Sequence, residues 1–250
     1  MSDVKKNILL ICEGNTEERL FKKLISLFPI GSHYEVYQYK TNIYALVNFI
    51  KNNYDSIKEL EAISITQILR ELSRNSVEEV EILSKKFTDI ILLFDFEPHD
   101  ANFSKEDIVY LQEIYSESTD RGQLYINYPM IESAFHFSSL PDDSYLHKTV
   151  HVDVLKNGNY KRQVGDEGKI TIQRLDNSKL PFILNHTYEK IETLVGISIN
   201  SYNKLLDYQI IQVEDKGIIS VLSTVYMFLH DYNRTEFLVL IDSTSSTISD

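Results

Sequence analysis

NILLIC, residues 7–12, is followed directly by Glu13-Gly14-Asn15 and then by residues 16–28, where apolar side chains recur with helical spacing. A short, uninterrupted apolar run of this kind is typical of a strand that is buried on both faces. A second such run, DIILLF at residues 89–94, ends directly before Asp95. Buried strands that alternate with amphipathic helices predict an α/β protein with a parallel sheet and helices on both faces.

The remaining elements follow from the same periodicities. We predict strands over 34–39 and 124–126, and helices over 43–54, 63–72, 77–87, 105–116, 131–137, 188–206 and 213–232. The polar segment 142–177 contains three glycines and is expected to form a loop region or a small subdomain. The tail 243–250 is rich in Ser and Thr and is expected to fray. The chain is therefore predicted to have a sheet domain over 1–140 and a mainly helical C-terminal extension over 141–250.

Composition narrows the classes of protein that the chain can belong to. Of its 250 residues, 43% are hydrophobic and 25% are charged, which is ordinary for a globular protein. With Cys12 as the single cysteine, a disulfide within the chain is excluded and a cysteine-based zinc site is nearly excluded. The apolar stretch near the N-terminus is too short for a signal peptide or a membrane span, so we expect a cytoplasmic protein with no membrane partner.

The net charge of -12 argues against a protein that coats nucleic acid by electrostatics alone. One segment departs from this acidity, because residues 148–179 carry seven Lys and Arg and only four Asp and Glu. Four of these basic residues are candidates for binding nucleic acid or a partner protein: Lys156, Lys161, Arg162 and Lys169. The alternative is a solvated surface loop of mixed charge.

Two acidic groups follow the predicted buried strands directly, and they are the candidates for chemistry. Glu13 comes after the first strand, and Asp95 with Glu97 comes after DIILLF. In an open parallel sheet the carboxyl ends of the strands line the ligand crevice, so these acids should face one another there. Gathered carboxylates need a shared proton or a cation, and their oxygens suit Mg²⁺ or Mn²⁺. The alternative for each acid alone is a helix cap or a turn residue.

Neighbouring polar residues extend this candidate site. Glu17 and Asp100 could be further metal ligands, although the helix dipole alone explains an acid at Glu17. His99 could be a ligand or a general base, and the alternative is an ordinary surface histidine. Glu132 is predicted near the start of a helix, where it faces either the metal site or solvent.

Three ordered segments resemble a known family. ICEGNTEERLF (11–21) resembles the first motif of Toprim domains, in the extended form found in nucleases of the OLD and RloB-like types. LLFDFEPHD (92–100) looks like their D-x-D motif, and INYPMIESAFHF (126–137) resembles the N-P-x-x-E segment of RloB-like proteins. The resemblance implies a Toprim-like Rossmannoid core with Glu13 as general base or metal ligand and Asp95 as metal ligand. Glu97 would take the second acidic position, where the family usually has Asp.

This resemblance implies a divalent-metal-dependent endonuclease that hydrolyses phosphodiester bonds in DNA or RNA. It further implies an effector of bacterial anti-phage defence, of the abortive-infection type, that acts with an ATPase subunit; a homo-oligomer is compatible with the sequence. One alternative is a non-catalytic Toprim-like subunit that binds such a partner. Another is a receiver-like phosphoacceptor domain, for which the interval between Glu13 and Asp95 is long. The chain lacks the glycine motifs of dinucleotide-binding and P-loop proteins.

Overall fold

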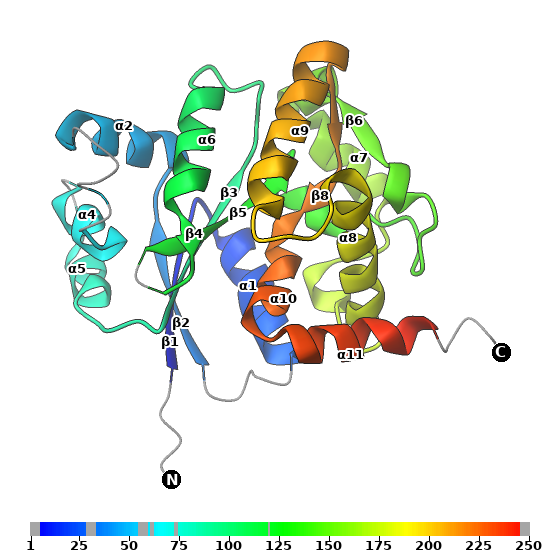
Figure 1. The fold of residues 1–250 in the computed structure, drawn as a ribbon, viewed down its shortest axis with the longest axis horizontal. Helices are drawn as coiled ribbons and strands as arrows, with labels where there is room; N and C mark the ends of the chain where they lie inside the picture. Colours follow the sequence, from blue (N-terminus) through cyan, green and yellow to red (C-terminus); the bar gives the residue numbers. More distant parts are fainter. Residues whose placement is uncertain are drawn as a thin grey trace, which may run out of the picture.

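The computed structural model describes residues 6–28, 34–54, 60, 63–72, 75–119 and 121–245. Its centre is a sheet with the strand order β2-β1-β3-β5-β4, to which β8 is added beside β5 (Figure 1). The strands are β1 (Lys6–Cys12), β2 (Tyr34–Lys40), β3 (Asp89–Asp95), β4 (Ser116–Glu117), β5 (Gly122–Tyr128) and β8 (Leu222–Ser223). The neighbours β2, β1, β3 and β5 run parallel, and only the two-residue strands β4 and β8 pair antiparallel with β5. The predicted mostly parallel sheet is thus confirmed.

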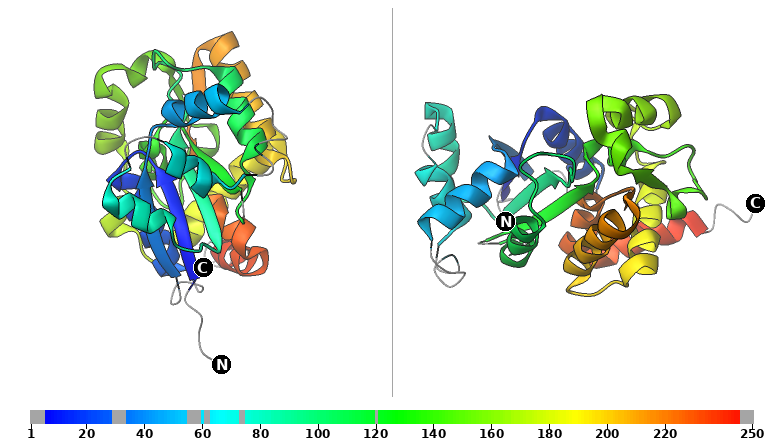
Figure 2. Two further views of the ribbon diagram at one scale, coloured as in Figure 1. Left: turned by 90° about the vertical axis from the view of Figure 1, so that its left-hand side faces the viewer. Right: turned by 90° about the horizontal axis from the view of Figure 1, so that it is seen from above.

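Helices flank this sheet, as the alternating pattern predicts. The N-terminal half contributes α1 (Asn15–Leu27), α2 (Ile43–Asn53), α4 (Ile65–Glu71), α5 (Val77–Leu83), α6 (Lys105–Ile114) and the 3-10 turn η2 (Ile131–Phe135). Seen from above, α1 lies on one face of the sheet and α6 on the other (Figure 2). β1 and β3 are buried along most of their length, because they sit between these layers in the middle of the sheet. Within the described residues, no helix has the length and apolar character needed to cross a bilayer.

The C-terminal half is mostly helical but differs from the prediction in detail. Its elements are η3 (Tyr145–His147), β6 (Thr149–His151), η4 (Val152–Gly158), α7 (Asn159–Glu167), η5 (Ile172–Arg174), α8 (Leu180–Val195), α9 (Ser201–Lys216), β7 (Ile218–Ser220), η6 (Thr224–Met227), α10 (Phe228–Tyr232) and α11 (Arg234–Ser245). The predicted loop region 142–177 therefore holds one α-helix, three short 3-10 turns and β6, which pairs with β7. The last five residues of the chain lie outside the described residues, and so does most of the predicted frayed tail.

Two predicted C-terminal helices are wrong, and glycine explains both errors. The helix predicted over 188–206 is interrupted because α8 ends at Gly196, which has a positive φ of 74°. The helix predicted over 213–232 is interrupted because α9 ends at Gly217, with φ 65°, and two short strands follow. Glycine adopts a positive φ without the steric cost of a Cβ, so it ends helices that an apolar pattern alone would continue.

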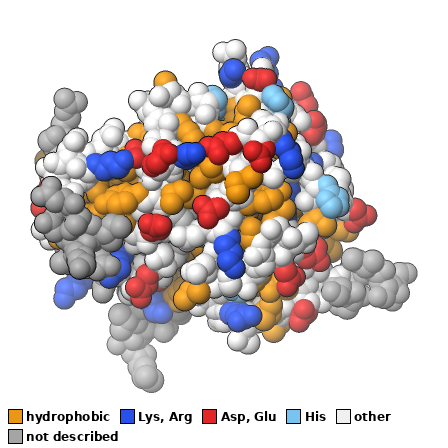
Figure 3. Space-filling view, turned by 45° about the horizontal axis from the view of Figure 1, so that its top comes forward, with side chains coloured by type: hydrophobic (Ala, Val, Ile, Leu, Met, Phe, Trp, Pro, Cys, Tyr) orange, Lys and Arg blue, Asp and Glu red, His pale blue; other side chains and the backbone are white. Residues whose placement is uncertain are grey.

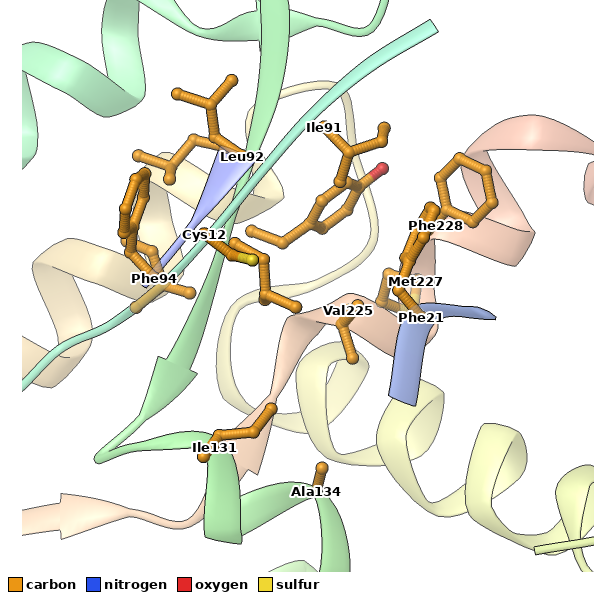
Figure 4. Packing of buried hydrophobic residues seen from close by; sticks show 14 of the residues in the cluster. Cys12, Phe21, Ile91, Leu92, Phe94, Ile131, Ala134, Val225, Met227 and Phe228 are labelled. Carbon is orange, nitrogen blue, oxygen red and sulfur yellow. The ribbon is translucent and has the colours of Figure 1, made fainter. Parts of the chain in front are cut away.

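The C-terminal half shares one hydrophobic core with the sheet (Figure 4). The aromatic rings of Phe228 and Phe21 lie 4.9 Å apart, which joins the segment after β8 to α1. The Thr224 hydroxyl accepts a hydrogen bond from the Ile126 amide at 2.7 Å and donates one to the Ile126 carbonyl at 3.0 Å. Residues from the C-terminal half therefore complete the sheet beside β5, close to the candidate site. A division of the chain into two domains near residue 140 stays a prediction.

Candidate functional site

The register of the parallel strands brings the two acidic segments together. β1 and β3 are direct neighbours with Cys12 opposite Leu93, so Glu13 and Asp95 leave the sheet at the same edge. Both side chains line one cleft of about 490 Å³. The parallel register thus brings Glu13 and Asp95 to the same cleft at the carboxyl end of the sheet. That their carboxylate oxygens converge on one point stays a prediction.

Five carboxylates line this hollow, which we call the acidic cleft: Glu13, Glu17, Asp95, Glu97 and Glu132. They come from four different places in the fold, namely the end of β1, the first turn of α1, the end of β3 with the loop after it, and η2. Lys161 of α7 also lines the cleft and is the one Lys or Arg among the lining residues that the structure describes. Several like charges in one cleft repel one another, so the arrangement favours protons or a bound cation.

Asp95 is the acid held most firmly in place. Its Oδ1 accepts a hydrogen bond from Nδ2 of Asn127, its partner in the neighbouring strand, at 2.8 Å. The Asn127 Oδ1 in turn accepts a hydrogen bond from the Ser223 hydroxyl at 2.6 Å, and both of these residues are fully buried. Burial raises the pKa of Asp95 well above its ordinary value, and the charges of Glu17 and Glu97 act in the same direction against the hydrogen bond from Asn127. The chain thus fixes the direction of this carboxylate without neutralising its charge.

Glu17 and Glu18 stand side by side in the sequence but have different environments. Glu18 pairs with Lys22 one turn further along α1 at 2.6 Å. Glu17 is only 6% exposed, and its Oε2 is buried without a hydrogen-bond partner among the described residues. Burial raises the pKa of Glu17, and the Glu132 charge adds to this shift. The helix dipole alone does not account for such a side chain, since that role requires no burial in a cleft.

Gly14 leaves room for the Glu17 carboxylate. A Cβ atom at this position would stand 3.1 Å from Glu17 Oε2, which is closer than an ordinary contact. The glycine of the turn therefore allows the carboxylate to lie against the backbone at the start of α1.

Glu13 and Glu97 occupy the more open part of the cleft. Glu13 Oε1 accepts a hydrogen bond from Asn42 Nδ2 at 3.2 Å. Loss of hydration at the cleft wall raises the pKa of Glu13 and of Glu97, and neighbouring acids raise both further. Glu97 has a φ of 33°, an uncommon conformation for a residue with a side chain, and both its N–H and that of Phe96 donate to the Pro129 carbonyl. Backbone strain of this kind is concentrated at functional sites.

The predicted basic residues do not act as one group. Lys161 Nζ lies 3.4 Å from Glu132 Oε1 at the acidic cleft. Lys156 pairs with Asp153 at 3.1 Å, Arg162 donates to the Asn159 side chain, and Lys169 is exposed; none of these three lines the cleft. The structure therefore brings one of the four candidates to the acids.

His99 and Asp100 divide in a similar way. His99 lines the cleft, and partial burial lowers the pKa of its imidazole. Asp100 is not among the cleft residues, and its Oδ1 accepts hydrogen bonds from the amide and the side chain of Asn102 at 2.7 and 3.0 Å. Its charge still raises the pKa of Glu13 and Glu97, so it belongs to the electrostatic surroundings of the site.

The donors in the acidic cleft suit a hard divalent cation. Carboxylate oxygens are the ligands that Mg²⁺ and Mn²⁺ favour, and the unpartnered Oε2 of Glu17 is one such oxygen. Among the described residues, no three His, Cys, Asp or Glu side chains stand close enough together to hold a metal ion as they are. A cation would therefore require cleft side chains to rotate inward.

Asn127 and Ser223 are the site residues that sequence reasoning did not assign. Asn127 lies in the segment that resembles the N-P-x-x-E motif, but Tyr128 separates it from Pro129, which obscured its place. Nothing in the local sequence marks Ser223, since its contact depends on β8 pairing with β5 from 96 residues away. Comparisons of this chain with protein-family models, with curated proteins and with solved structures find no match.

Proposed function

We propose that this chain hydrolyses phosphodiester bonds in DNA or RNA with Mg²⁺ or Mn²⁺, at an acidic centre of the Toprim type. The observation that carries the proposal is the gathering of five carboxylates, most with raised pKa values, at the carboxyl ends of adjacent parallel strands. Keeping five acids in one cleft beside a single described lysine is costly, so perturbed acids of this kind favour a functional over a purely structural site.

Each group has a role in this proposal. Glu13, Asp95 and Glu97 would hold the metal, with Glu17 as a further ligand. A bound divalent cation supplies charge neutralisation and a lowered pKa for bound water. Asn127 and Ser223 keep the Asp95 carboxylate aimed at the cleft, and Lys161 offers a cation to a phosphate that enters beside Glu132. His99 also lines the cleft, and partial burial lowers the pKa of its imidazole, so it is the candidate to accept a proton there.

The distribution of charge supports a partner for substrate recruitment. On the face shown in Figure 3, the described basic side chains lie among acidic and hydrophobic ones and form no extended patch. The whole chain carries a net charge of -12, whereas tight binding to nucleic acid needs clustered Lys and Arg. We therefore propose a second subunit, an ATPase as the resemblance implies, that brings nucleic acid to this chain in an anti-phage system.

The direct test is incubation of the purified chain with plasmid, single-stranded DNA and total RNA in the presence of Mg²⁺, Mn²⁺ or a chelator. We expect cleavage of at least one substrate with a metal and none with the chelator. An absence of metal-dependent cleavage, both alone and with the co-expressed partner, would overturn the proposal.

A non-catalytic, partner-binding role is the second candidate, and one observation favours it. The acids of the cleft are not gathered closely enough in the described structure to hold a metal. Calorimetric titration with Mn²⁺ separates the two candidates. A nuclease should bind Mn²⁺, and Asp95→Asn should abolish that binding. A subunit that keeps these acids for partner binding alone should not bind Mn²⁺ at Asp95.

A further inference from the structure

A second hollow, which we call the amide pocket, lies apart from the acidic cleft and shares no lining residue with it. It is formed by α6 and the start of β5 on one side and by the α8–α9 loop, α9, α10 and the start of α11 on the other. Helices α6 and α9 run side by side here (Figure 1). The pocket has a volume of about 380 Å³, which is within the range of small-molecule sites.

Two buried glutamines give this pocket unsatisfied hydrogen-bonding capacity. Gln112 and Gln123 both line it and are only 1% and 6% exposed. Each donates from Nε2 to the same acceptor, the Leu124 carbonyl, at 3.3 and 3.2 Å. No donor from the described residues reaches either Oε1. Neither Oε1 is among the buried atoms without a partner, so both oxygens are open to the solvent of the pocket, and a ligand with complementary donors can take the place of water there.

A histidine among the lining residues of the pocket also has a polar atom without a hydrogen-bond partner among the described residues. His230 Nδ1 lies 3.1 Å from Asp231 Oδ1, while its Nε2 is buried without a partner in the described structure. Asp231 is fully engaged, because its Oδ2 also accepts hydrogen bonds from the hydroxyls of Tyr125 and Tyr202. Both oxygens of Asp231 thus have partners within the protein, and Glu117 of β4 is the other acid among the described lining residues.

The mouth of the pocket carries a cation and an apolar side chain. Arg234 is exposed and lines the pocket, and no acid among the described residues forms an ion pair with it. Ile199 stands in the α8–α9 loop with 98% of its surface exposed, and the side chain of Tyr202 lies in the same wall. An unpaired guanidinium binds phosphate through its planar fork of donors, and apolar and aromatic side chains cover the face of a flat ligand.

We propose that the amide pocket binds a nucleotide, with the base at Gln112 and Gln123 and the phosphate at Arg234. A glutamine amide presents one donor and one acceptor, which matches the paired donor and acceptor on the edge of a base. A ligand that brings only an anion leaves the two amides unpaired, and one that brings only a base leaves Arg234 unpaired. The site is separate from the acidic cleft and does not depend on the nuclease proposal.

Calorimetric titration of the full chain with AMP, GMP, CMP and UMP tests this site, with the four corresponding nucleosides and inorganic phosphate as partial ligands. We expect at least one monophosphate to bind more tightly than its nucleoside. Arg234→Ala should weaken monophosphate binding about tenfold or more and leave nucleoside binding unchanged, because it removes a charge-assisted hydrogen bond. Gln123→Leu should weaken both. Arg19→Ala, an exposed arginine on α1 outside the pocket, is the matched control and should change neither.

Two outcomes would overturn the proposal: no binding of any of the four monophosphates, or binding that is lost in Lys161→Ala and retained in Arg234→Ala. The second outcome would place the nucleotide in the acidic cleft. Thermal unfolding of each variant shows whether it folds, and because Arg234 is exposed, its variant keeps the test decisive if Gln123→Leu does not fold.

Discussion

Two aspartates in different regions of the molecule show how the fold treats a carboxylate. Asp95 lies in the acidic cleft, where burial and neighbouring acids raise its pKa. Asp142 lies beside the C-terminal helices and is 3% exposed. Burial alone would raise the pKa of Asp142, but hydrogen bonds from Ser144 and from the Ser138 amide, together with the Lys148 charge, bring it below the ordinary value.

The difference lies in the partners that each region supplies. Asp142 accepts hydrogen bonds from the Ser138 amide at 2.7 Å and from the Ser144 amide at 3.1 Å, and Lys148 Nζ is 3.7 Å away. Asp95 has the amide of Asn127 as its side-chain donor and faces other acids. A carboxylate that the protein supplies with hydrogen-bond donors and a cation stabilises the fold. A carboxylate that lacks a cationic partner and faces other acids is available to bind a ligand.

The largest expected effect is the loss of catalysis when Asp95 is replaced. Asp95→Asn should lower metal-dependent cleavage about a thousandfold, because a neutral amide is a weaker ligand for a divalent cation. Circular dichroism should show an unchanged fold. Cleavage rates like those of the unmodified chain would remove Asp95 from the proposed mechanism.

At Asp142, the expected effect of a substitution is on the stability of the fold. Asp142→Ala should lower the free energy of unfolding by about 2–3 kcal/mol, since it removes a buried carboxylate that accepts hydrogen bonds from the Ser138 and Ser144 amides and forms an ion pair with Lys148. Urea denaturation measures this loss, and metal-dependent cleavage by the folded fraction should be unaffected. A stability within about 0.5 kcal/mol of the unmodified chain would break the comparison.

The support of Asp95 by Asn127 and Ser223 predicts an intermediate effect. Ser223→Ala should lower the cleavage rate about tenfold, as loss of a residue that orients a metal ligand commonly does. Ser133→Ala is the matched control, because Ser133 is equally buried and donates to the Leu222 carbonyl of the same strand β8 without contacting Asn127. Equal losses in both variants would show that Ser223 acts only by holding β8.

A smaller effect should separate two of the basic residues. Lys161→Ala should raise the KM for nucleic acid about fivefold and change kcat less, because one exposed phosphate contact is lost at the cleft. Lys156→Ala removes a lysine that pairs with Asp153 outside the cleft, and it should leave both constants unchanged. Steady-state kinetics at fixed ionic strength compares them, and equal effects would mean that the basic segment acts as a whole.

The smallest effect is the pH dependence of stability in the absence of metal. A carboxyl whose pKa is raised on folding makes the folded chain bind more protons than the unfolded chain, so its contribution to stability falls as pH rises. Asp95→Asn removes this contribution, so the gain in Tm of the variant over the unmodified chain should grow as the pH rises above the ordinary pKa of an aspartate. Taking the difference cancels the titrating groups that lie away from Asp95, whereas Glu17 and Glu97 interact with it directly. A gain that shrinks with rising pH would contradict the raised pKa.

The sequence by itself determined the parallel sheet and the position of its acids. Uninterrupted apolar runs such as NILLIC and DIILLF form buried strands through local pattern alone, and the residue that follows each run must leave the sheet at its carboxyl edge. Glu13 and Asp95 could therefore be placed together before the structure was known. The sequence also determines the ends of α8 and α9, because Gly196 and Gly217 lie there with positive φ. The apolar periodicity continues past both glycines and therefore predicted longer helices.

Only the tertiary structure decided which charged side chains have a hydrogen-bond or ion-pair partner and which do not. The burial of Glu17 but not Glu18, the arrival of Lys161 at the cleft and the bond from Ser223 to Asn127 all depend on contacts between elements far apart in the chain. The same holds for the amide pocket, where α6, β5 and α10 contribute one unpaired group or more each. Hydrogen bonds and electrostatic shifts act over a few ångströms in space, and sequence periodicity records the secondary structure of a segment without naming its neighbours.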